Sequence, residues 1–179
     1  MAPPDHRSAR RPVVGVMGAG EEATSAVMAL AEALGTALAE HGWVVLSGGR
    51  DCGVMAAVSR GAAQVEGHLV VGILPDLGSS ACSSLDLVIP TGLGQARNLI
   101  NVLAADAVVV CGSGGPGTAS EACHAIKAGK PLLLLQPTEL WASFLRSLDP
   151  QVQVCSDVPS LVAALELLFE RTSDPVLGD

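Results

Sequence analysis

Residues 107–118 read AVVVCGSGGPGT, so that an apolar run leads directly into a loop with four glycines. A continuous apolar run of this length is typical of a parallel strand that is buried on both faces. Pro116 fits the first position of a helix, because its missing N–H would have no partner there in any case. The stretch therefore predicts a strand, a tight loop and a helix, the unit from which parallel α/β sheets are built.

The glycine-rich loop is also a candidate anion site. A helix N-terminus offers free backbone N–H groups and the positive end of the helix dipole, and glycines let a ligand approach the backbone closely. We expect a phosphate-bearing ligand to bind at Ser113, Gly114, Gly115, Pro116, Gly117 and Thr118. Thr118 and Glu121 also match a helix capping box, which is the purely structural alternative for both residues.

Apolar runs and helical patterns alternate along the rest of the chain. Strands are predicted at 13–17, 43–46, 69–74, 86–89, 107–111, 132–135 and 152–155, and helices at 21–40, 52–65, 94–104, 118–128, 140–148 and 158–170. This alternation predicts a single Rossmann-like, doubly wound α/β domain with a mainly parallel sheet of about six or seven strands. We place the domain at 12–171, between disordered tails at 1–11 and 172–179.

Three glycine-bearing segments, at 18–20, 48–53 and 112–117, each follow a predicted strand. Because the carboxyl ends of parallel strands meet at one edge of a sheet, these segments should converge there. In the first two segments and just beyond them, the predicted ligand-binding residues are Gly18, Ala19, Gly48, Gly49, Arg50, Gly53, Val54 and Met55. The first segment also fits a tight turn without a ligand, and Arg50 is either a phosphate contact or a solvated side chain paired with Asp51.

Two polar residues, Arg97 and Asn98, lie near the start of the helix predicted over 94–104. An arginine in the first turn of a helix gains nothing from the helix dipole, which favours anions at that end. We therefore expect Arg97 to contact the ligand or to pair with Glu121, the alternative being a surface arginine. His124, one turn after Glu121, is better explained as an ordinary helical histidine.

The composition argues against several classes of protein. A formal net charge of −8, an aromatic content of 2% and the absence of tyrosine disfavour binding to nucleic acid. The five cysteines are dispersed and form no CxxC pair, so neither a disulfide framework nor a protein-ligated metal is expected. No apolar stretch is long enough to cross a membrane, and the N-terminal stretch lacks the apolar segment of a secretory signal. We expect a cytoplasmic protein that contacts neither nucleic acid nor membrane.

Several segments, taken together in their order and spacing, resemble the superfamily labelled "lysine decarboxylase-like". They are Ser47-Gly48-Gly49-Arg50 with Gly53-Val54-Met55, then Arg97-Asn98, and finally Gly114-Gly115-Pro116-Gly117-Thr118 with Glu121. The resemblance covers roughly residues 12–135. The superfamily contains the LOG-type phosphoribohydrolases and the molybdenum cofactor carrier proteins. Membership implies a Rossmann-like fold and a homodimer or homotetramer.

The two branches imply different roles for Arg97 and Glu121. In the phosphoribohydrolases the matching arginine and glutamate act in cleaving the N-glycosidic bond of a nucleoside 5′-monophosphate, so these two residues would be catalytic. The enzyme pattern has a lysine where this chain has Asn98, a proline where it has Ser113, and a glutamate where it has Ser120. The Arg-Asn pair looks more like the carrier branch.

The resemblance therefore favours a carrier or storage protein for the molybdenum cofactor (molybdopterin). The cofactor would be bound cargo, with no protein-ligated metal, and transient contact with molybdoenzymes would follow. The alternative is a LOG-type phosphoribohydrolase that acts on cytokinin nucleotides or AMP. A nucleotide sensor or DNA-processing relative is a third class, and the net charge of −8 counts against contact with DNA.

Overall fold

The structure, a computed structural model, describes residues 10–173. Most of the two predicted tails, residues 1–9 and 174–179, lies outside the described residues. Arg10 and Arg11, at the end of the first predicted tail, contact the domain. Arg10 forms an ion pair with Asp106, and Arg11 donates hydrogen bonds to the carbonyl oxygens of residues 42 and 67.

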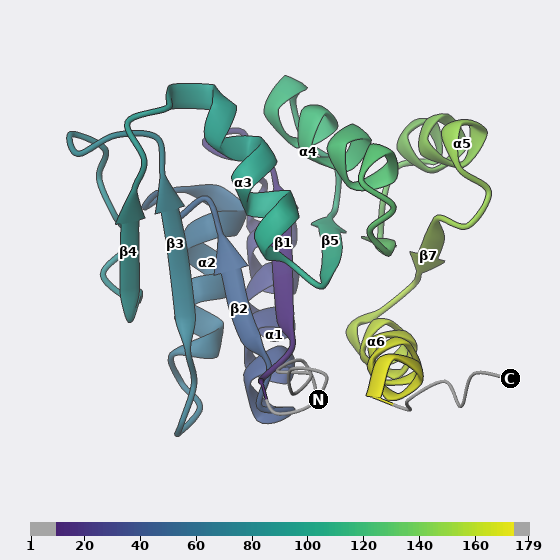
Figure 1. The fold of residues 1–179 in the computed structure, drawn as a ribbon, viewed down its shortest axis with the longest axis horizontal. Coiled ribbons are helices and arrows are strands. Elements are labelled where there is room, and N and C mark those ends of the chain that lie inside the picture. The colour runs from purple at the N-terminus through teal and green to yellow at the C-terminus, as the bar shows by residue number, and fades with distance from the viewer. Residues whose placement is uncertain (1–9, 174–179) are drawn as a thin grey trace, which may run out of the picture.

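The strands form one seven-stranded sheet in the order β4-β3-β2-β1-β5-β6-β7 (Figure 1). The strands are β1 (Val13–Gly18), β2 (Val44–Ser47), β3 (Val70–Leu74), β4 (Leu87–Pro90), β5 (Ala107–Cys111), β6 (Leu132–Leu135) and β7 (Gln153–Cys155). Every pair of neighbouring strands is parallel. The predicted Rossmann-like α/β fold with a parallel sheet is therefore confirmed.

Helices cover both faces of the sheet. The helices are α1 (Ser25–Glu40), α2 (Gly53–Ala62) and α6 (Val158–Ser173) on one face, and α3 (Arg97–Ala104), α4 (Pro116–Lys127) and α5 (Glu139–Leu148) on the other. Successive residues of β5 alternate between the two cores, Val109 toward α1 and Val108 toward α3. None of the described helices is long and apolar enough to cross a bilayer.

Two helices begin later than the sequence pattern predicts. The helix predicted from residue 21 begins at Ser25, because the Thr24 side chain accepts a hydrogen bond from the Val27 N–H and caps it. The helix predicted over 94–104 divides into a short 3₁₀ turn, Gly94–Ala96, and α3. The second difference matters for the site, because it places Arg97 at the first residue of α3.

The strand order reverses at β1, which pairs with β2 on one side and β5 on the other. The chain after β1 leaves toward α1 on one face, and the chain after β5 leaves toward α4 on the opposite face. A crevice opens at such a switch point, beyond the carboxyl ends of the strands, and it is where ligands bind in open α/β sheets.

Helices α1 and α2 pack backbone against backbone through two glycines. A Cβ atom on Gly61 would lie 1.9 Å from the Glu32 carbonyl oxygen, and one on Gly35 would lie 2.1 Å from the Val58 carbonyl oxygen. The Thr36 hydroxyl donates a hydrogen bond of 3.0 Å to the carbonyl of Gly61 across the same contact. This close approach fixes α2, and with it the loop that precedes α2, relative to α1.

We expect Gly61→Ala to lower the free energy of unfolding by about 1–3 kcal/mol or more, because the added methyl group has no room against backbone. The loss should appear although alanine favours a helix by about 1 kcal/mol over glycine. Urea unfolding gives the measurement. Gly78→Ala, in an exposed loop, is the control and should change stability by less than about 0.5 kcal/mol. Equal effects for the two variants would contradict the close packing.

Candidate functional site

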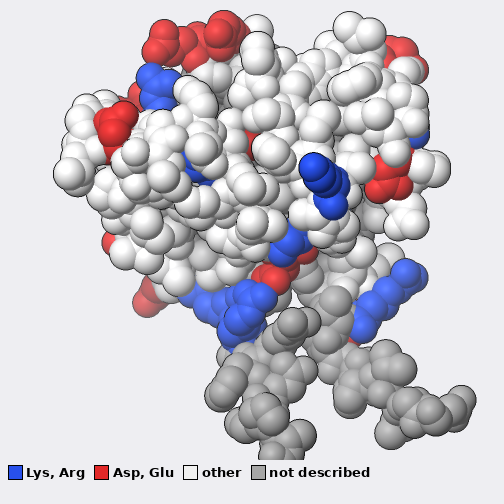
Figure 2. Space-filling view, turned by 45° about the horizontal axis from the view of Figure 1, so that its top comes forward, with Lys and Arg blue, Asp and Glu red and all other residues white. Residues whose placement is uncertain are grey.

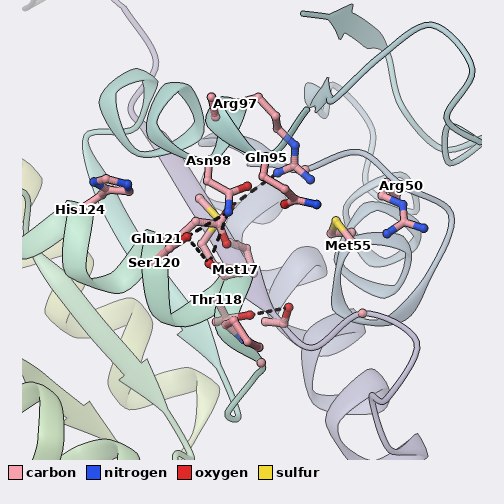
Figure 3. Close-up of a pocket in the computed structure, with 18 of the residues that line it drawn as sticks. Met17, Arg50, Met55, Gln95, Arg97, Asn98, Thr118, Ser120, Glu121 and His124 are labelled. Carbon is pink, nitrogen blue, oxygen red and sulfur yellow. Dashed lines mark hydrogen bonds and ion pairs between the residues drawn. The ribbon is translucent and has the colours of Figure 1, made fainter. Parts of the chain in front are cut away.

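A cavity of about 680 Å³ opens at the switch point between the carboxyl ends of β1 and β2 and the first turns of α3 and α4. Eleven of the predicted binding residues line it: Gly18, Gly48, Arg50, Met55, Arg97, Asn98, Gly115, Pro116, Gly117, Thr118 and Glu121. Figure 3 shows Arg50 and Met55 on one side of the cavity, Asn98, Ser120 and Glu121 on the other, and Arg97 between them. Residues from all three glycine-bearing segments therefore meet, as the sequence predicts.

Six predicted binding residues do not line the cavity: Ala19, Gly49, Gly53, Val54, Ser113 and Gly114. They shape the loops around it. Gly53 has a φ of +52°, and a Cβ atom there would lie 2.0 Å from the Gly20 carbonyl oxygen. The Val54 N–H donates a hydrogen bond of 3.0 Å to the Ala19 carbonyl, which joins the start of α2 to the loop after β1.

The loop before α4 is held by similar local contacts. The Ser113 hydroxyl accepts a hydrogen bond of 3.1 Å from the Thr138 N–H. A Cβ atom on Gly114 would lie 2.3 Å from the Thr118 hydroxyl, so glycine makes room for that side chain. In the loop after β2, Gly49 likewise has a structural role, since it adopts a φ of +71°, a left-handed conformation that favours glycine. These residues position the site and have no direct access to the cavity.

The first turn of α4 presents backbone N–H groups to the cavity. Gly115 is the N-cap and provides no side-chain cap, and Pro116 takes the first helical position. Thr118 is not a cap, because its hydroxyl donates a hydrogen bond of 2.9 Å to the Gly18 carbonyl at the end of β1. The capping-box alternative for Thr118 and Glu121 is therefore wrong. The N–H groups of this turn have no partner within the helix and are available to an anion.

Arg97 and Glu121 form a buried ion pair at the wall of the cavity. Their side chains are 8% and 9% exposed, and Arg97 Nη1 lies 3.6 Å from Glu121 Oε1. The same carboxylate oxygen accepts a hydrogen bond of 2.9 Å from Asn101 Nδ2. The surface-arginine alternative for Arg97 is wrong, and the predicted pairing with Glu121 is confirmed.

This buried cluster is incompletely satisfied. Arg97 Nε and Asn101 Oδ1 have no hydrogen-bond partner in the part of the chain that the structure describes. Burial lowers the pKa of Arg97, and Glu121 opposes that shift. Burial also raises the pKa of Glu121, against the hydrogen bond from Asn101 and the charge of Arg97. A buried guanidinium with an unpaired N–H is costly unless a further acceptor is supplied, and the cavity is where an acceptor can enter.

Gly48 allows the Arg97 guanidinium to lie against the loop after β2. A Cβ atom at Gly48 would lie 2.7 Å from Arg97 Nη1 and 2.8 Å from Met55 Sδ. The nearest atoms are therefore the ends of two long side chains and not backbone. A glycine at this position keeps the guanidinium at the cavity wall.

Asn98 and Ser120, two positions that depart from the phosphoribohydrolase pattern, contact each other. Asn98 Nδ2 donates a hydrogen bond of 3.0 Å to the Ser120 hydroxyl, which in turn donates one of 2.7 Å to the Gly117 carbonyl. This chain of hydrogen bonds joins the first turn of α3 to the first turn of α4. Neutral side chains therefore stand where the enzyme pattern has lysine and glutamate.

Arg50 lies at the rim of the cavity with 44% of its side chain exposed. Its charged partner is Glu21, 3.5 Å away, in place of the Asp51 considered from the sequence. An exposed pair of this kind contributes at most about 1 kcal/mol, so Arg50 can turn toward an anionic ligand at little cost.

The cavity has eight further lining residues: Val16, Met17, Gly20, Glu22, Gln95, Ala96, Ser120 and His124. His124 lies three residues after Glu121 and so on the same face of α4, which is the signal that would have placed it here. Met17 precedes Gly18 on β1 and carries no sequence signal of its own. Asn101 contacts Glu121 and lies one turn after Arg97 on α3. That spacing from Arg97 is the sequence signal that would have placed Asn101 near the site.

The fold and this geometry define a Rossmann-like protein with a candidate oxyanion pocket at the switch point of its sheet. The chain belongs to the SLOG cluster4 family, whose sequence model matches residues 11–162. The resemblance to the LOG-like superfamily that the sequence predicts is thereby confirmed.

Two solved structures are similar over nearly the whole chain. The molybdenum cofactor binding protein from the phototrophic bacterium Rippkaea orientalis is 41% identical, with a TM-score of 0.83 over 89% of this chain and 98% of that one. The molybdenum cofactor carrier protein from Chlamydomonas reinhardtii is 39% identical, with a TM-score of 0.85 over 90% and 99%. An uncharacterized protein of Archaeoglobus fulgidus is 41% identical over 69% of this chain and 80% of its own length.

Thr118→Val should lower the free energy of unfolding by about 1–2 kcal/mol, because it removes a partly buried hydrogen bond to the Gly18 carbonyl while keeping the side-chain volume. Chemical denaturation at neutral pH gives the measurement. Thr118→Ser retains the hydroxyl and is the matched control, which should lose less. If the two variants are equally stable, the hydroxyl does not join α4 to β1.

Proposed function

We propose that this protein binds the molybdenum cofactor (molybdopterin) as a carrier or storage protein. The observation that carries the proposal is the Arg97 guanidinium, which lies 3.6 Å from Glu121 at the wall of the cavity that the N-terminus of α4 also borders. The 39–41% identity to proteins named as binding or carrying this cofactor supports the choice of ligand.

The residues present fit a phosphorylated pterin. The cavity of about 680 Å³ lies within the range of about 300–1,000 Å³ that is usual for small-molecule sites. The first turn of α4, at Gly117 and Thr118, would hold the phosphate. The amides of Gln95 and Asn98 line the cavity and can pair with the polar edges of a heterocycle, and the Met55 thioether can contact its flat face.

The molybdenum itself would be held by the cofactor. The described residues contain no group of three or more His, Cys, Asp or Glu side chains placed to hold a metal ion. The bound cofactor supplies its own redox-active metal centre, and this chain supplies binding, orientation and exclusion of solvent.

A phosphoribohydrolase is the second candidate, because Arg97 and Glu121 lie together in the cavity, as that activity would need. The contact between Asn98 and Ser120 weighs against it, since neutral groups stand where the enzyme pattern has charged ones. We therefore place binding without turnover first.

Arg97→Gln should weaken binding of molybdopterin about tenfold or more, since a hydrogen bond to a charged group contributes about 1.5–3 kcal/mol. Binding can be followed anaerobically by the fluorescence of the oxidised pterin that remains bound after gel filtration. Arg60→Gln is the matched control, because it removes the same charge from an exposed position on α2 outside the cavity and should bind like the parent.

Failure of the parent protein to retain molybdopterin would overturn the carrier proposal. Release of adenine and ribose 5-phosphate from AMP, lost in Glu121→Gln, would establish the phosphoribohydrolase instead. The two assays on one preparation therefore separate the two candidates.

We further propose that the protein is a homodimer or homotetramer. Apolar side chains are exposed on α3, β4 and α5: Leu99, Leu103, Leu87, Ile89, Leu140, Phe144 and Leu148. Leu87 and Ile89 pair with Val71 and Ile73, which face the α3 side of the sheet, so the residues on β4 and α3 share one face. Residues other than Lys, Arg, Asp and Glu, apolar and polar alike, cover most of the surface seen in Figure 2. Exposed apolar side chains that gather on one face are typical of an interface between subunits.

Leu99→Glu combined with Leu103→Glu should reduce the assembly to smaller species, because two charges would have to be buried at the interface. Light scattering after size-exclusion chromatography gives the mass. Leu77→Glu is the control, because Leu77 is 88% exposed on a loop and should leave the mass unchanged. An unchanged mass in the double variant would remove α3 from the interface.

We place the protein in the cytoplasm, in transient contact with molybdoenzymes that receive the cofactor. All five cysteines are free, which supports a reducing compartment. A carrier of this kind needs a step that lowers its affinity when the cargo is handed on, and the pocket contains a group suited to that role.

A further inference from the structure

Glu121 places a negative charge in a pocket that otherwise suits an anion. Its carboxylate is nearly fully buried, lines the cavity, and lies 3.6 Å from the guanidinium that an incoming oxyanion would use. At that distance the pair is not a hydrogen bond, although the Arg97 guanidinium lines the cavity. An oxyanion can therefore make better contacts with Arg97 than Glu121 does.

Asn101 determines where the Glu121 carboxylate lies. Its Nδ2 donates a hydrogen bond of 2.9 Å to Oε1, the same oxygen that faces Arg97. Asn101 is fully buried, and its Oδ1 has no partner among the described residues. The amide group thus contains both a donor for the ionised carboxylate and, after rotation, an acceptor for the protonated acid.

We propose that Glu121, positioned by Asn101, competes with the anionic group of the ligand for Arg97, and that the pocket takes up one proton when an oxyanion binds. The proton comes from solvent and converts the Glu121 carboxylate to the neutral acid, so charge is balanced when the oxyanion replaces it on Arg97. The inference rests on the proposed function only in that the ligand carries an oxyanion. Protonation of Glu121 lets the site hold its ligand, and loss of that proton favours release.

The direction of the pH dependence follows from the groups that face Glu121. Burial already raises the pKa of the Glu121 carboxyl, and a second anion beside it raises that pKa further. The facing charged groups are Arg97 on α3, His124 on α4, Arg50 after β2 and Glu22 after β1. Glu22 is exposed. His124 is a histidine that lines the same cavity, so it needs its own control.

Sulfate is a suitable probe, because it does not itself titrate near neutral pH. Its dissociation constant should be measured by NMR titration between about pH 5 and pH 9 on the full chain. Above the pKa of Glu121 we expect the affinity of the parent protein to fall by about tenfold per pH unit, since each binding event takes up one proton. Glu121→Gln should bind sulfate at least as tightly as the parent at high pH and should lack this slope.

His124→Gln should retain the slope of the parent, which assigns it to Glu121. A slope that disappears in His124→Gln and persists in Glu121→Gln would overturn the proposal. Absence of sulfate binding to the parent at the lowest pH would also overturn it. These results do not depend on molybdopterin, so a protein that fails to bind the pterin but shows the sulfate slope refutes the proposed function alone.

Asn101→Leu tests the positioning role. Without the hydrogen bond to its ionised form, the pKa of Glu121 should rise, so the break in the sulfate profile should move to higher pH. A profile identical to that of the parent would show that Asn101 has no part in the competition. If Asn101→Leu does not fold, Asn101→Ser gives the same comparison. Serine keeps a smaller hydroxyl donor, so the break should move to higher pH by less than complete loss of the donor would cause.

Discussion

The reversal of strand order at β1 is the constraint on which the rest of the structure depends. Because β1 pairs with β2 and with β5, the chains that leave these strands pass to opposite faces of the sheet. The space between them cannot be filled by a crossover helix. It is bordered by the ends of β1 and β2 and by the first turns of α3 and α4, which supply the polar groups of the cavity. Topology alone therefore creates an opening in which backbone N–H groups face solvent.

The fold is predictable from the sequence because its strands are nearly pure apolar runs. The predicted strands 107–111 and 132–135 agree with β5 and β6 residue for residue, since both are buried on each face and end at glycine or polar residues. Helix starts are less predictable. Thr118 and Glu121 have the spacing of a capping box, yet Pro116 already begins the helix, and the Thr118 hydroxyl pairs with β1. That contact joins residues one hundred positions apart, which local patterns do not report.

The site is predictable in outline and less so in its details, and the glycines show why. Gly48 makes room for a guanidinium at the cavity, whereas Gly53 and Gly114 make room for the protein's own backbone and for the Thr118 side chain. Both requirements favour glycine, because it has no Cβ atom. A sequence pattern therefore identifies the segments that meet at the site and does not separate contact with a ligand from contact with a neighbouring loop. Asn101 lies one turn after Arg97, but the sequence does not show that it contacts Glu121, because Glu121 lies on another helix.

The buried pair of Arg97 and Glu121 shows how a binding pocket can be stable and still incomplete. A lone buried guanidinium would be very costly, so the carboxylate is needed while the pocket contains no ligand. A fully hydrogen-bonded pair, in contrast, would leave the guanidinium with little to offer an anion. The 3.6 Å separation and the unpaired Nε lie between these limits. The pair neutralises charge without a hydrogen bond between its members, so an oxyanion that enters the cavity can form with the guanidinium the hydrogen bond that Glu121 does not.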